Sequence, residues 1–431
     1  MQTVDLHTGL AAAAWRENTI GTLYEMAKRA PGQALSLDFG TRQVLLLQDA
    51  EHIRHVLRTN PNAYQKNFGG FRALFGESRL TADGERWEFL QKLSQPHINV
   101  APIREVGLSA YAAFSAAAAD LLEAGATGKT VDVDGPANRA SARVASDVVF
   151  GFHDLDIDQV LDDFRAVLRH GGSRNWNFDG AMTDTPPQRQ RLAEAKRRLS
   201  TVVQQLIGQA AERGVGSDLV SDIAAAGSLG VDALSEICTL LFAGFDTTST
   251  AVSWALFLLA AAPDLQRHLR AEIREAGFSG EAPEAAGEIG DLVAFQNEVM
   301  RIFPPVPVLG RIAVATDSIS DIAVSVGQVV LISLIGLHHD ARYFASPAHV
   351  RLKRYVDGQL SKTLRGHLLP FGDGKRVCGG GRLANIELTV ALATLIDRIE
   401  VNIAESEPIK FDWTASLRRA GGQWLLTRPA S

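Results

Sequence analysis

The sequence has 431 residues, enough for two or three average domains or for one large single-domain enzyme. Hydrophobic residues make up 46% and charged residues 21%, values that exclude a disordered or fibrous chain. The 43 Lys and Arg residues against 49 Asp and Glu residues give a net charge of −6, which argues against a nucleic-acid-binding protein. Because only Cys238 and Cys378 are cysteines, a disulfide scaffold is excluded and a cytoplasmic location is expected.

No targeting signal or membrane anchor is predicted. The first 20 residues lack a basic segment followed by a long apolar run. The apolar run over residues 237–262 carries Asp246 and five hydroxyl side chains in its middle, which a lipid-facing span would not place there. This run therefore predicts a long buried helix.

In the first half of the chain, residues 34–48 form two β-like runs broken at Gly40, which predicts a hairpin. A helix is expected over residues 49–60, and residues 61–85, rich in Gly, Asn and Phe, are expected to be a loop region. Residues 110–124 combine alanines with large apolar side chains at helical spacing, which predicts another helix. The segment 171–190 is expected to be a mobile connection between two helices.

In the second half, residues 231–262 predict one helix of about 45 Å at 1.5 Å per residue. Pro263 should end it and start a second helix over residues 264–276. Short strands are expected within residues 311–334, and a helix over residues 382–398. The fold class is therefore mainly α with small β-sheets. No G-x-G-x-x-G turn indicates a nicotinamide or flavin domain.

One cysteine stands in the run Phe-Gly-Asp-Gly-Lys-Arg-Val-Cys-Gly-Gly over residues 371–380. The glycines allow tight turns and close approach of a large planar ligand. The start of a helix and the charge of Arg376 should both lower the pKa of the Cys378 thiol and favour the thiolate. A thiolate can be a nucleophile or a metal ligand. The loop contains no histidine-type base for the first role, and a haem would need only this one protein ligand for the second.

This run resembles the haem-ligand loop of the cytochrome P450 superfamily, Phe-x-x-Gly-x-Arg-x-Cys-x-Gly, and the residues that follow resemble the family's proximal helix. The resemblance implies haem b (iron protoporphyrin IX) with Cys378 as the axial ligand of the iron. Phe371 would pack against the haem and the sulfur, and Arg376 would meet a haem propionate. Gly372 and Gly380 would belong to the same cofactor-binding loop.

A second run, Ala243-Gly244-Phe-Asp246-Thr247-Thr, lies inside the long predicted helix. Taken alone, it could be a satisfied helix interruption, since Thr hydroxyls bond back to carbonyls four residues earlier. Beside a haem cysteine, it resembles the family's oxygen-activation motif. The resemblance gives Asp246 and Thr247 the task of holding an ordered water and relaying protons to dioxygen, a general acid task, with Ala243 and Gly244 close to the haem.

A third motif, Glu298-Val-Met-Arg301, is followed by Phe-Pro-Pro-Val-Pro, as in the family. Arg354, in a segment that resembles the family's Pro-Glu-Arg-Phe, would complete an ion network of structural role. For the haem propionates, Arg311 matches a family arginine. Trp87 and Lys92 are the candidates on a helix where Gln91 stands in place of the family's arginine.

The resemblance runs from about residue 20 to the C-terminus. It implies residues 1–20 as an N-terminal extension and residues 21–431 as a catalytic domain with the cytochrome P450 fold, a single large domain around a buried haem. The implied function is a monooxygenase that inserts one atom of O2 into an apolar small molecule. A peroxygenase or an oxidative-coupling enzyme is the alternative, and a haem electron carrier or sensor is a third, less favoured class.

Since no reductase domain is evident, electrons are expected from a separate ferredoxin or flavodoxin type of protein with its reductase. Lys375 and Arg382 are its candidate docking charges, with Lys92 beside them. The substrate cannot be identified from the sequence. Its predicted pocket lining is mainly apolar: Phe68, Phe71, Phe75, residues 176–178, Leu240, Ala243, residues 306–309 and residues 420–422.

Overall fold

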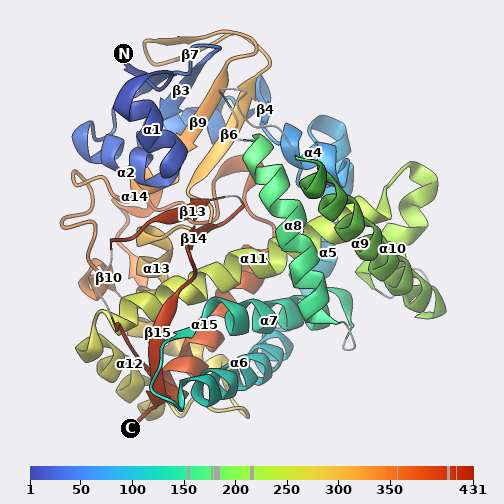
Figure 1. Cartoon of the computed structure of the whole chain (residues 1–431), viewed down its shortest axis with the longest axis vertical. Helices are drawn as coiled ribbons and strands as arrows, with labels where there is room; N and C mark the ends of the chain where they lie inside the picture. The colour runs from blue at the N-terminus through green and yellow to red at the C-terminus, as the bar shows by residue number, and fades with distance from the viewer. Residues whose placement is uncertain are drawn as a thin grey trace.

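Helices form most of the chain, and the largest sheet gathers near the N-terminus, at the top of Figure 1. The computed structural model describes residues 1–152, 156–175, 178, 185–213, 218–356, 358–404, 408–413 and 415–431. Its α-helices are α1 (Gly9–Glu17), α2 (Thr19–Arg29), α3 (Ala50–Arg54), α4 (Gly69–Phe75), α5 (Gly84–Val100), α6 (Ile103–Gly125), α7 (Asp134–Ala145), α8 (Ile157–Asn175), α9 (Pro186–Arg213), α10 (Leu219–Ala225), α11 (Ala233–Ala260), α12 (Pro263–Glu275), α13 (Gly290–Ile302), α14 (Leu334–His338) and α15 (Gly381–Arg398).

The largest sheet has six strands in the order β1-β2-β3-β9-β6-β4. The hairpin of β2 and β3 is antiparallel and pairs Leu35 with Leu46, as expected from the break at Gly40. The other sheets are small and join β12, β15 and β5, β10 and β11, β13 and β14, and β7 and β8. The strands are β1 (Gln2–Asp5), β2 (Leu35–Asp38), β3 (Gln43–Leu47), β4 (Tyr64–Lys66), β5 (Val131–Asp132), β6 (Val308–Ala313), β7 (Asp317–Ile319), β8 (Ile322–Val324), β9 (Val329–Ser333), β10 (Tyr355–Val356), β11 (Gln359–Leu360), β12 (Ile399–Asn402), β13 (Phe411–Trp413), β14 (Leu417–Arg419) and β15 (Trp424–Pro429).

Helix α11 crosses the centre of the molecule (Figure 1). The Asp232 side chain caps its start by accepting a hydrogen bond from the Leu234 N–H, and Pro263 begins α12 directly after it. Its side chains are apolar nearly all round, and most are buried, as is typical of a core helix. Trp254 of α11 stacks on Phe303 with ring centroids 3.9 Å apart. The long helix predicted from the sequence is therefore confirmed.

Among the described residues, no single helix is long and apolar enough to cross a membrane. One pair of described helices, α11 and α12 taken together, has the length and apolar composition of a membrane span, but the pair is bent by 114°.

The helices expected over residues 110–124, 264–276 and 382–398 are confirmed within α6, α12 and α15. The helix expected over residues 49–60 is divided into α3 and a π-helical turn, His55–Thr59. The expectation that residues 61–85 form a loop region is wrong in part, because they contain β4 and α4. Burial of Phe71 against Phe68 stabilises α4 despite the two glycines at its start. The middle of the expected connection over residues 171–190 lies outside the described residues.

The first strand lies inside the residues predicted to be an N-terminal extension. β1 pairs in parallel with β2, with Gln2 opposite Leu35 and Asp5 opposite Asp38. The boundary at residue 20 stays a prediction.

Candidate active site

The cysteine loop is a tight turn that delivers Cys378 to the start of α15. The Cys378 N–H donates to the Phe371 carbonyl at 2.9 Å, which closes the loop. Gly372 and Gly374 have φ angles of 75° and 71°, the left-handed region that favours glycine. A Cβ on Gly374 would also overlap the carbonyl of Leu57, so the loop lies directly against the π-helical turn His55–Thr59.

The thiol of Cys378 differs from the sequence-based expectation. Burial raises the pKa of this thiol, and the effect outweighs the hydrogen bonds from the Gly380 and Gly381 backbones and the charges of Arg79 and Lys66, which all act to lower it. The expectation of a lowered pKa is therefore wrong for the protein without a metal. Cys378 is exposed to the cavity that it lines, but the protein around the sulfur excludes enough water to disfavour the charged thiolate. A bound metal cation would supply the missing compensation for a thiolate.

A cavity of about 370 Å³ opens over the cysteine loop. One wall carries Phe371, Cys378 and Gly380, and another carries Ala243, Gly244 and Thr247 of α11. The structure thus brings the two sequence motifs, more than 120 residues apart in the chain, to one cavity. Most of the remaining lining is apolar: Phe68, Phe71, Leu80, Trp87, Ile98, Val106, Val144, Ala145, Val148, Val149, Leu240, Phe242, Ala251, Met300, Pro305, Val306, Val308, Leu309, Leu334, Pro370, Val377, Leu383, Ala384, Leu388, Trp413 and Ala415.

On the α11 wall, the Thr247 hydroxyl donates to the Ala243 carbonyl at 3.0 Å. A Thr that bonds back in this way competes with the helix's own hydrogen bond and bends it locally. Thr248 lines the same cavity and bonds similarly to the Gly244 carbonyl, at 3.4 Å. The hydroxyl oxygen of Thr247 keeps acceptor capacity toward the cavity.

Asp246 lies behind this wall and is not among the residues that line the cavity. Its Oδ1 pairs with the Arg418 guanidinium at 2.8 Å, and Arg418 also donates to the Asn138 side chain at 2.9 Å. The second carboxylate oxygen, Oδ2, is buried and has no hydrogen-bond partner among the described residues. A relay through Asp246 would therefore begin at a carboxylate held by Arg418 of β14. No sequence motif indicated Arg418 as the partner of Asp246.

Three cations share one acid at another edge of the cavity. Arg376 pairs with Asp83 at 2.7 Å and also donates to the Ala82 carbonyl. Arg311 donates to the Gly310 carbonyl at 2.9 Å, and the Lys66 amine donates to the Leu80 carbonyl at 3.0 Å. All three side chains line the cavity.

Burial lowers the pKa of each of these groups, to about 7 for Lys66 and about 10 for Arg311 and Arg376, with mutual repulsion adding to the effect for Lys66 and Arg311. Asp83 opposes the shift in all three, but it also pairs with the half-exposed Arg72 at 3.7 Å. The group of Lys66, Arg311 and Arg376 thus has a surplus of positive charge directed at the cavity.

Of the two candidates on α5, Trp87 is buried and lines the cavity, with the Arg376 guanidinium 4.0 Å from its ring centroid. Lys92 is exposed, and it is not among the residues that line the cavity. The sequence reasoning missed Lys66 and Arg79, which also line it. The absence of an arginine at position 91 was the one signal that cations had to come from elsewhere in the chain.

These residues fit a haem. The surplus positive charge suits the two carboxylates of the haem edge, since a buried cation is costly unless it is paired. The glycine loop leaves space for a planar group, because a Cβ on Gly380, which lines the cavity, would meet no atom within 4 Å. Glu387 also lines the cavity, and its Oε1 has no hydrogen-bond partner in the described part of the chain. Burial raises the pKa of Glu387 to about 8, so it adds little negative charge at neutral pH. Cys378, Arg311 and Arg376 would be the main holders of such a group.

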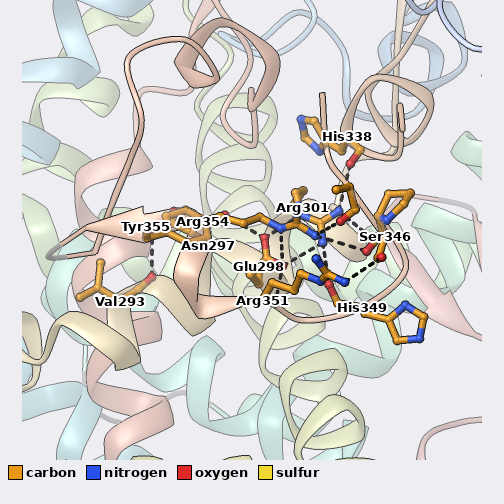
Figure 2. A network of polar contacts seen from close by, with 12 residues as sticks. Val293, Asn297, Glu298, Arg301, His338, Ser346, His349, Arg351, Arg354 and Tyr355 are labelled. Atoms are coloured by element: carbon orange, nitrogen blue, oxygen red, sulfur yellow. Dashed lines mark hydrogen bonds and ion pairs between the residues drawn. The ribbon is translucent and has the colours of Figure 1, made fainter. Parts of the chain in front are cut away.

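The third motif forms a separate buried network on α13 (Figure 2). The Glu298 carboxylate accepts from Arg301 at 2.7 and 2.9 Å and from Arg354 at 3.3 Å. The Tyr355 hydroxyl and the Arg351 N–H donate to the same carboxylate at 3.0 and 2.9 Å. Arg301 and Glu298 are 0% exposed. The predicted trio therefore lies together, and Arg354 is its one partly buried member.

The pocket residues predicted from the sequence divide into two groups. Phe68, Phe71, Leu240 and Ala243 line the cavity, as do Val306, Val308 and Leu309. Phe75 packs against Phe164, Phe178 packs against Phe39, and residues 420–422 are absent from the lining, so these predictions are wrong. Trp413 and Ala415 contribute instead of the 420–422 turn. Trp176 lies outside the described residues.

Mainly helical architecture, a lone cysteine at the start of a helix and a cation-rich cavity together define a haem-thiolate class of protein. The family model for Cytochrome P450 matches residues 228–425. Cyclooctat-9-en-7-ol 5-monooxygenase from Streptomyces melanosporofaciens is 28% identical over 392 residues, which cover 86% of this chain and 82% of that protein. Cyclooctatin synthase from the same organism is 27% identical over 86% of this chain and 83% of its own length. The crystal structure of CYP175A1 from Thermus thermophilus superposes with a TM-score of 0.78 at 20% identity, and the match covers 100% of both chains.

The chain belongs to the cytochrome P450 superfamily. Family membership makes it an enzyme of the haem-thiolate monooxygenase class and implies haem as its cofactor.

Proposed function

We propose that this enzyme inserts one oxygen atom from O2 into a neutral, apolar small molecule, with Cys378 as the axial thiolate of its haem. The observation that carries the proposal is the single cavity that the cysteine loop and the Ala243–Thr247 wall share. A bound haem would supply the activation of dioxygen, with electrons delivered one at a time by a separate protein.

The distribution of charge in the cavity supports a neutral substrate. The charged side chains of the lining belong to the cysteine loop, to the helix that follows it, or to the edge of the cavity that carries the cations. They are Lys66, Arg79, Arg311, Asp373, Arg376 and Glu387. On the α11 wall the lining residues are apolar or carry hydroxyls, such as Leu240, Ala243 and Thr248. An apolar wall with few polar groups gains most by excluding water around a hydrophobic substrate. One relative bears the name of an enzyme acting on cyclooctat-9-en-7-ol, which is consistent with a mostly hydrocarbon substrate.

The residues of the chain divide the remaining tasks. The backbones of Gly380 and Gly381 donate hydrogen bonds to the Cys378 sulfur and orient it. Thr247 holds a hydroxyl at the cavity wall, where it can bind a water and pass a proton to dioxygen. Asp246, behind it, relays protons to that water, and for this its carboxylate must exchange Arg418 for the water during turnover. Arg311 and Arg376 would bind the carboxylates of a haem, beside Trp87, over whose ring the Arg376 guanidinium lies.

The test of the cysteine is spectroscopic. The reduced protein with bound carbon monoxide should show the strongly red-shifted Soret band of thiolate ligation, and Cys378→His should abolish it. A band typical of histidine-ligated haem in freshly prepared wild-type protein would contradict the proposal. Screening neutral apolar compounds for displacement of the water on the ferric haem, seen as a spectral shift, would then identify the substrate class.

The test of the relay separates a monooxygenase from a peroxygenase. Thr247→Ala should retain haem and substrate binding but divert electrons from product to hydrogen peroxide. Asp246→Asn should slow turnover by roughly two orders of magnitude, the low end for a general acid–base group. Full coupling in Thr247→Ala, or wild-type activity driven by peroxide alone at the same rate, would favour the peroxygenase.

A further inference from the structure

Arg79 is a buried cation that none of the three motifs includes. It lies in the loop before α5 and is 9% exposed. Its Nη1 donates to the Ser94 hydroxyl at 2.9 Å, and its Nη2 donates to the Gln95 side-chain carbonyl. Its backbone N–H donates to the Glu236 carboxylate of α11 at 2.7 Å. The backbone N–H and the guanidinium of Arg79 are therefore both anchored, and the guanidinium cannot turn toward solvent without losing its hydrogen bonds.

The guanidinium lies against the residue that follows Cys378. A Cβ on Gly379 would overlap Nη2 of Arg79, so this position accommodates only glycine while Arg79 stays in place. Gln95, which holds the guanidinium, also donates to the Gly379 carbonyl at 2.9 Å. Arg79 and Cys378 both line the cavity. The positive charge is thus fixed beside the cysteine loop.

Among the described residues, the Arg79 guanidinium forms no ion pair with a carboxylate. Both hydrogen-bond partners of its guanidinium named above are neutral. Glu236 bonds the backbone N–H, and burial raises the pKa of Glu236 to about 7, so it is only about half ionised at neutral pH. Lys66, Arg311 and Arg376 have the carboxylate of Asp83 as a common anionic neighbour. The electrostatic partners of Arg79 are instead Glu236 and Cys378. A buried cation costs free energy unless an anion lies close to it, and the sulfur ligand is the anion that the geometry offers.

We propose that Arg79 is a positioning residue whose fixed positive charge beside the Cys378 sulfur raises the reduction potential of the iron that this sulfur ligates. The inference rests on the proposed haem ligation by Cys378. A cation beside a ligand sulfur draws electron density from the metal–sulfur bond and favours the reduced metal, as other second-shell groups around metal ligands do. The residue acts through the sulfur and needs no contact with substrate.

The test compares Arg79→Gln with Arg79→Lys in the haem-loaded enzyme. Arg79→Gln keeps a polar, hydrogen-bonding side chain but removes the charge. It should shift the midpoint potential of the ferric–ferrous couple to a more negative value and raise the iron–sulfur stretching frequency in the resonance Raman spectrum. Arg79→Lys, which keeps the charge, should restore both values toward wild type.

Two further variants separate charge beside the sulfur from other effects. Arg270→Gln removes a guanidinium that is 3% exposed and bonded to the Ile396 and Ile399 carbonyls, and it should leave both readouts unchanged. Arg311→Gln removes a charge on the Asp83 side, and it should leave the iron–sulfur frequency unchanged. If Arg79→Gln fails to fold, Ser94→Ala, which releases one hold on the guanidinium, should move both readouts in the same direction by less.

Wild-type potential and iron–sulfur frequency in Arg79→Gln would overturn the inference while the red-shifted Soret band upholds the proposed function. Equal shifts in Arg79→Gln and Arg79→Lys would also overturn it, because geometry rather than charge would then be responsible. Absence of the red-shifted band in wild-type protein would overturn the proposed function and the inference together.

Discussion

The buried charges around Glu298 and those at the edge of the cavity are organised in opposite ways. In the network around Glu298, one carboxylate receives hydrogen bonds from Arg301, Arg354 and Tyr355, and Arg301 donates its remaining bonds to backbone carbonyls (Figure 2). In the group of Lys66, Arg311 and Arg376, the cations share Asp83 and face a cavity. The charges of the Glu298 network are compensated within the protein, whereas the positive charge of Lys66, Arg311 and Arg376 is not fully compensated by Asp83.

This difference indicates what each group is for. A network that is complete within the chain holds the segments it connects, here α13 and residues 346–355. A group that leaves buried charge uncompensated destabilises the empty protein and gains only when an anionic ligand arrives. Substitutions should therefore change the stability of the chain in the first group and its affinity for haem in the second.

The largest effect is expected from breaking the complete network. Glu298→Ala leaves Arg301 buried without its carboxylate, so the free energy of unfolding should fall by about 3–5 kcal/mol. Denaturant unfolding followed by circular dichroism measures this loss. The control is Glu25→Ala, which removes an exposed partner of Lys28 and should change stability by about 0.5 kcal/mol or less. A wild-type unfolding midpoint in Glu298→Ala would remove the contrast between the two groups.

The second effect concerns the incomplete group. Arg311→Gln should lower haem affinity roughly 10- to 100-fold, because a hydrogen bond to a charged group contributes about 1.5–3 kcal/mol. The stability of the haem-free protein should stay equal or rise, because a costly buried charge is gone. Transfer of haem to an acceptor protein gives the affinity, and unfolding of the haem-free chain gives the stability. Arg270→Gln should show the reverse pattern, with lower stability and normal haem retention.

A third effect is the pH dependence that Lys66 introduces. Burial lowers the pKa of Lys66 from 10.5 to about 7 in the folded protein, so between these values the unfolded chain binds a proton that the folded chain does not. The contribution of Lys66 to the stability of the haem-free protein should therefore rise with pH across this window, by up to about 5 kcal/mol, and its full penalty should be present below pH 7.

The measurement is the difference between the stability curves of wild type and Lys66→Met from pH 6 to 10, because other groups titrate in the same range. The two curves should converge as the pH rises. Parallel curves would mean that Lys66 keeps its ordinary pKa and that the positive charge at this edge is less constrained than its burial indicates.

The smallest effect is expected from exposed charges. Lys375, half-exposed, pairs with Glu88, and Arg382 donates to the Ala101 carbonyl at 2.8 Å. With an acidic ferredoxin as partner, Lys375→Glu should reduce the second-order rate of electron transfer a few-fold, with a smaller difference at high salt and unchanged substrate affinity. Lys410→Glu, an exposed lysine paired with Glu17 of α1, is the matched control. Rates insensitive to salt and to Lys375→Glu would exclude electrostatic docking on this face.

Several features were predictable because local physics decides them. The apolar run of α11, the proline after it and the glycines around Cys378 each limit the backbone to few conformations, and the predicted elements at these places are confirmed. Predictions that depended on which way a side chain turns were less successful. Phe75 and Phe178 are apolar aromatic residues near the correct segments, but they pack against Phe164 and Phe39 rather than into the cavity.

By itself, the sequence determined the fold class and the cysteine loop. It also determined the positions of the acid and the alcohol in α11, because spacing along one element sets which residues share a face. Only the tertiary structure decided how charges are balanced. Arg418, 172 residues after Asp246, holds that carboxylate, and Arg79, nearly 300 residues before Cys378, lies against the cysteine loop. Electrostatic effects depend on distance and burial in space, and no pattern along the chain reports either of them before the chain has folded.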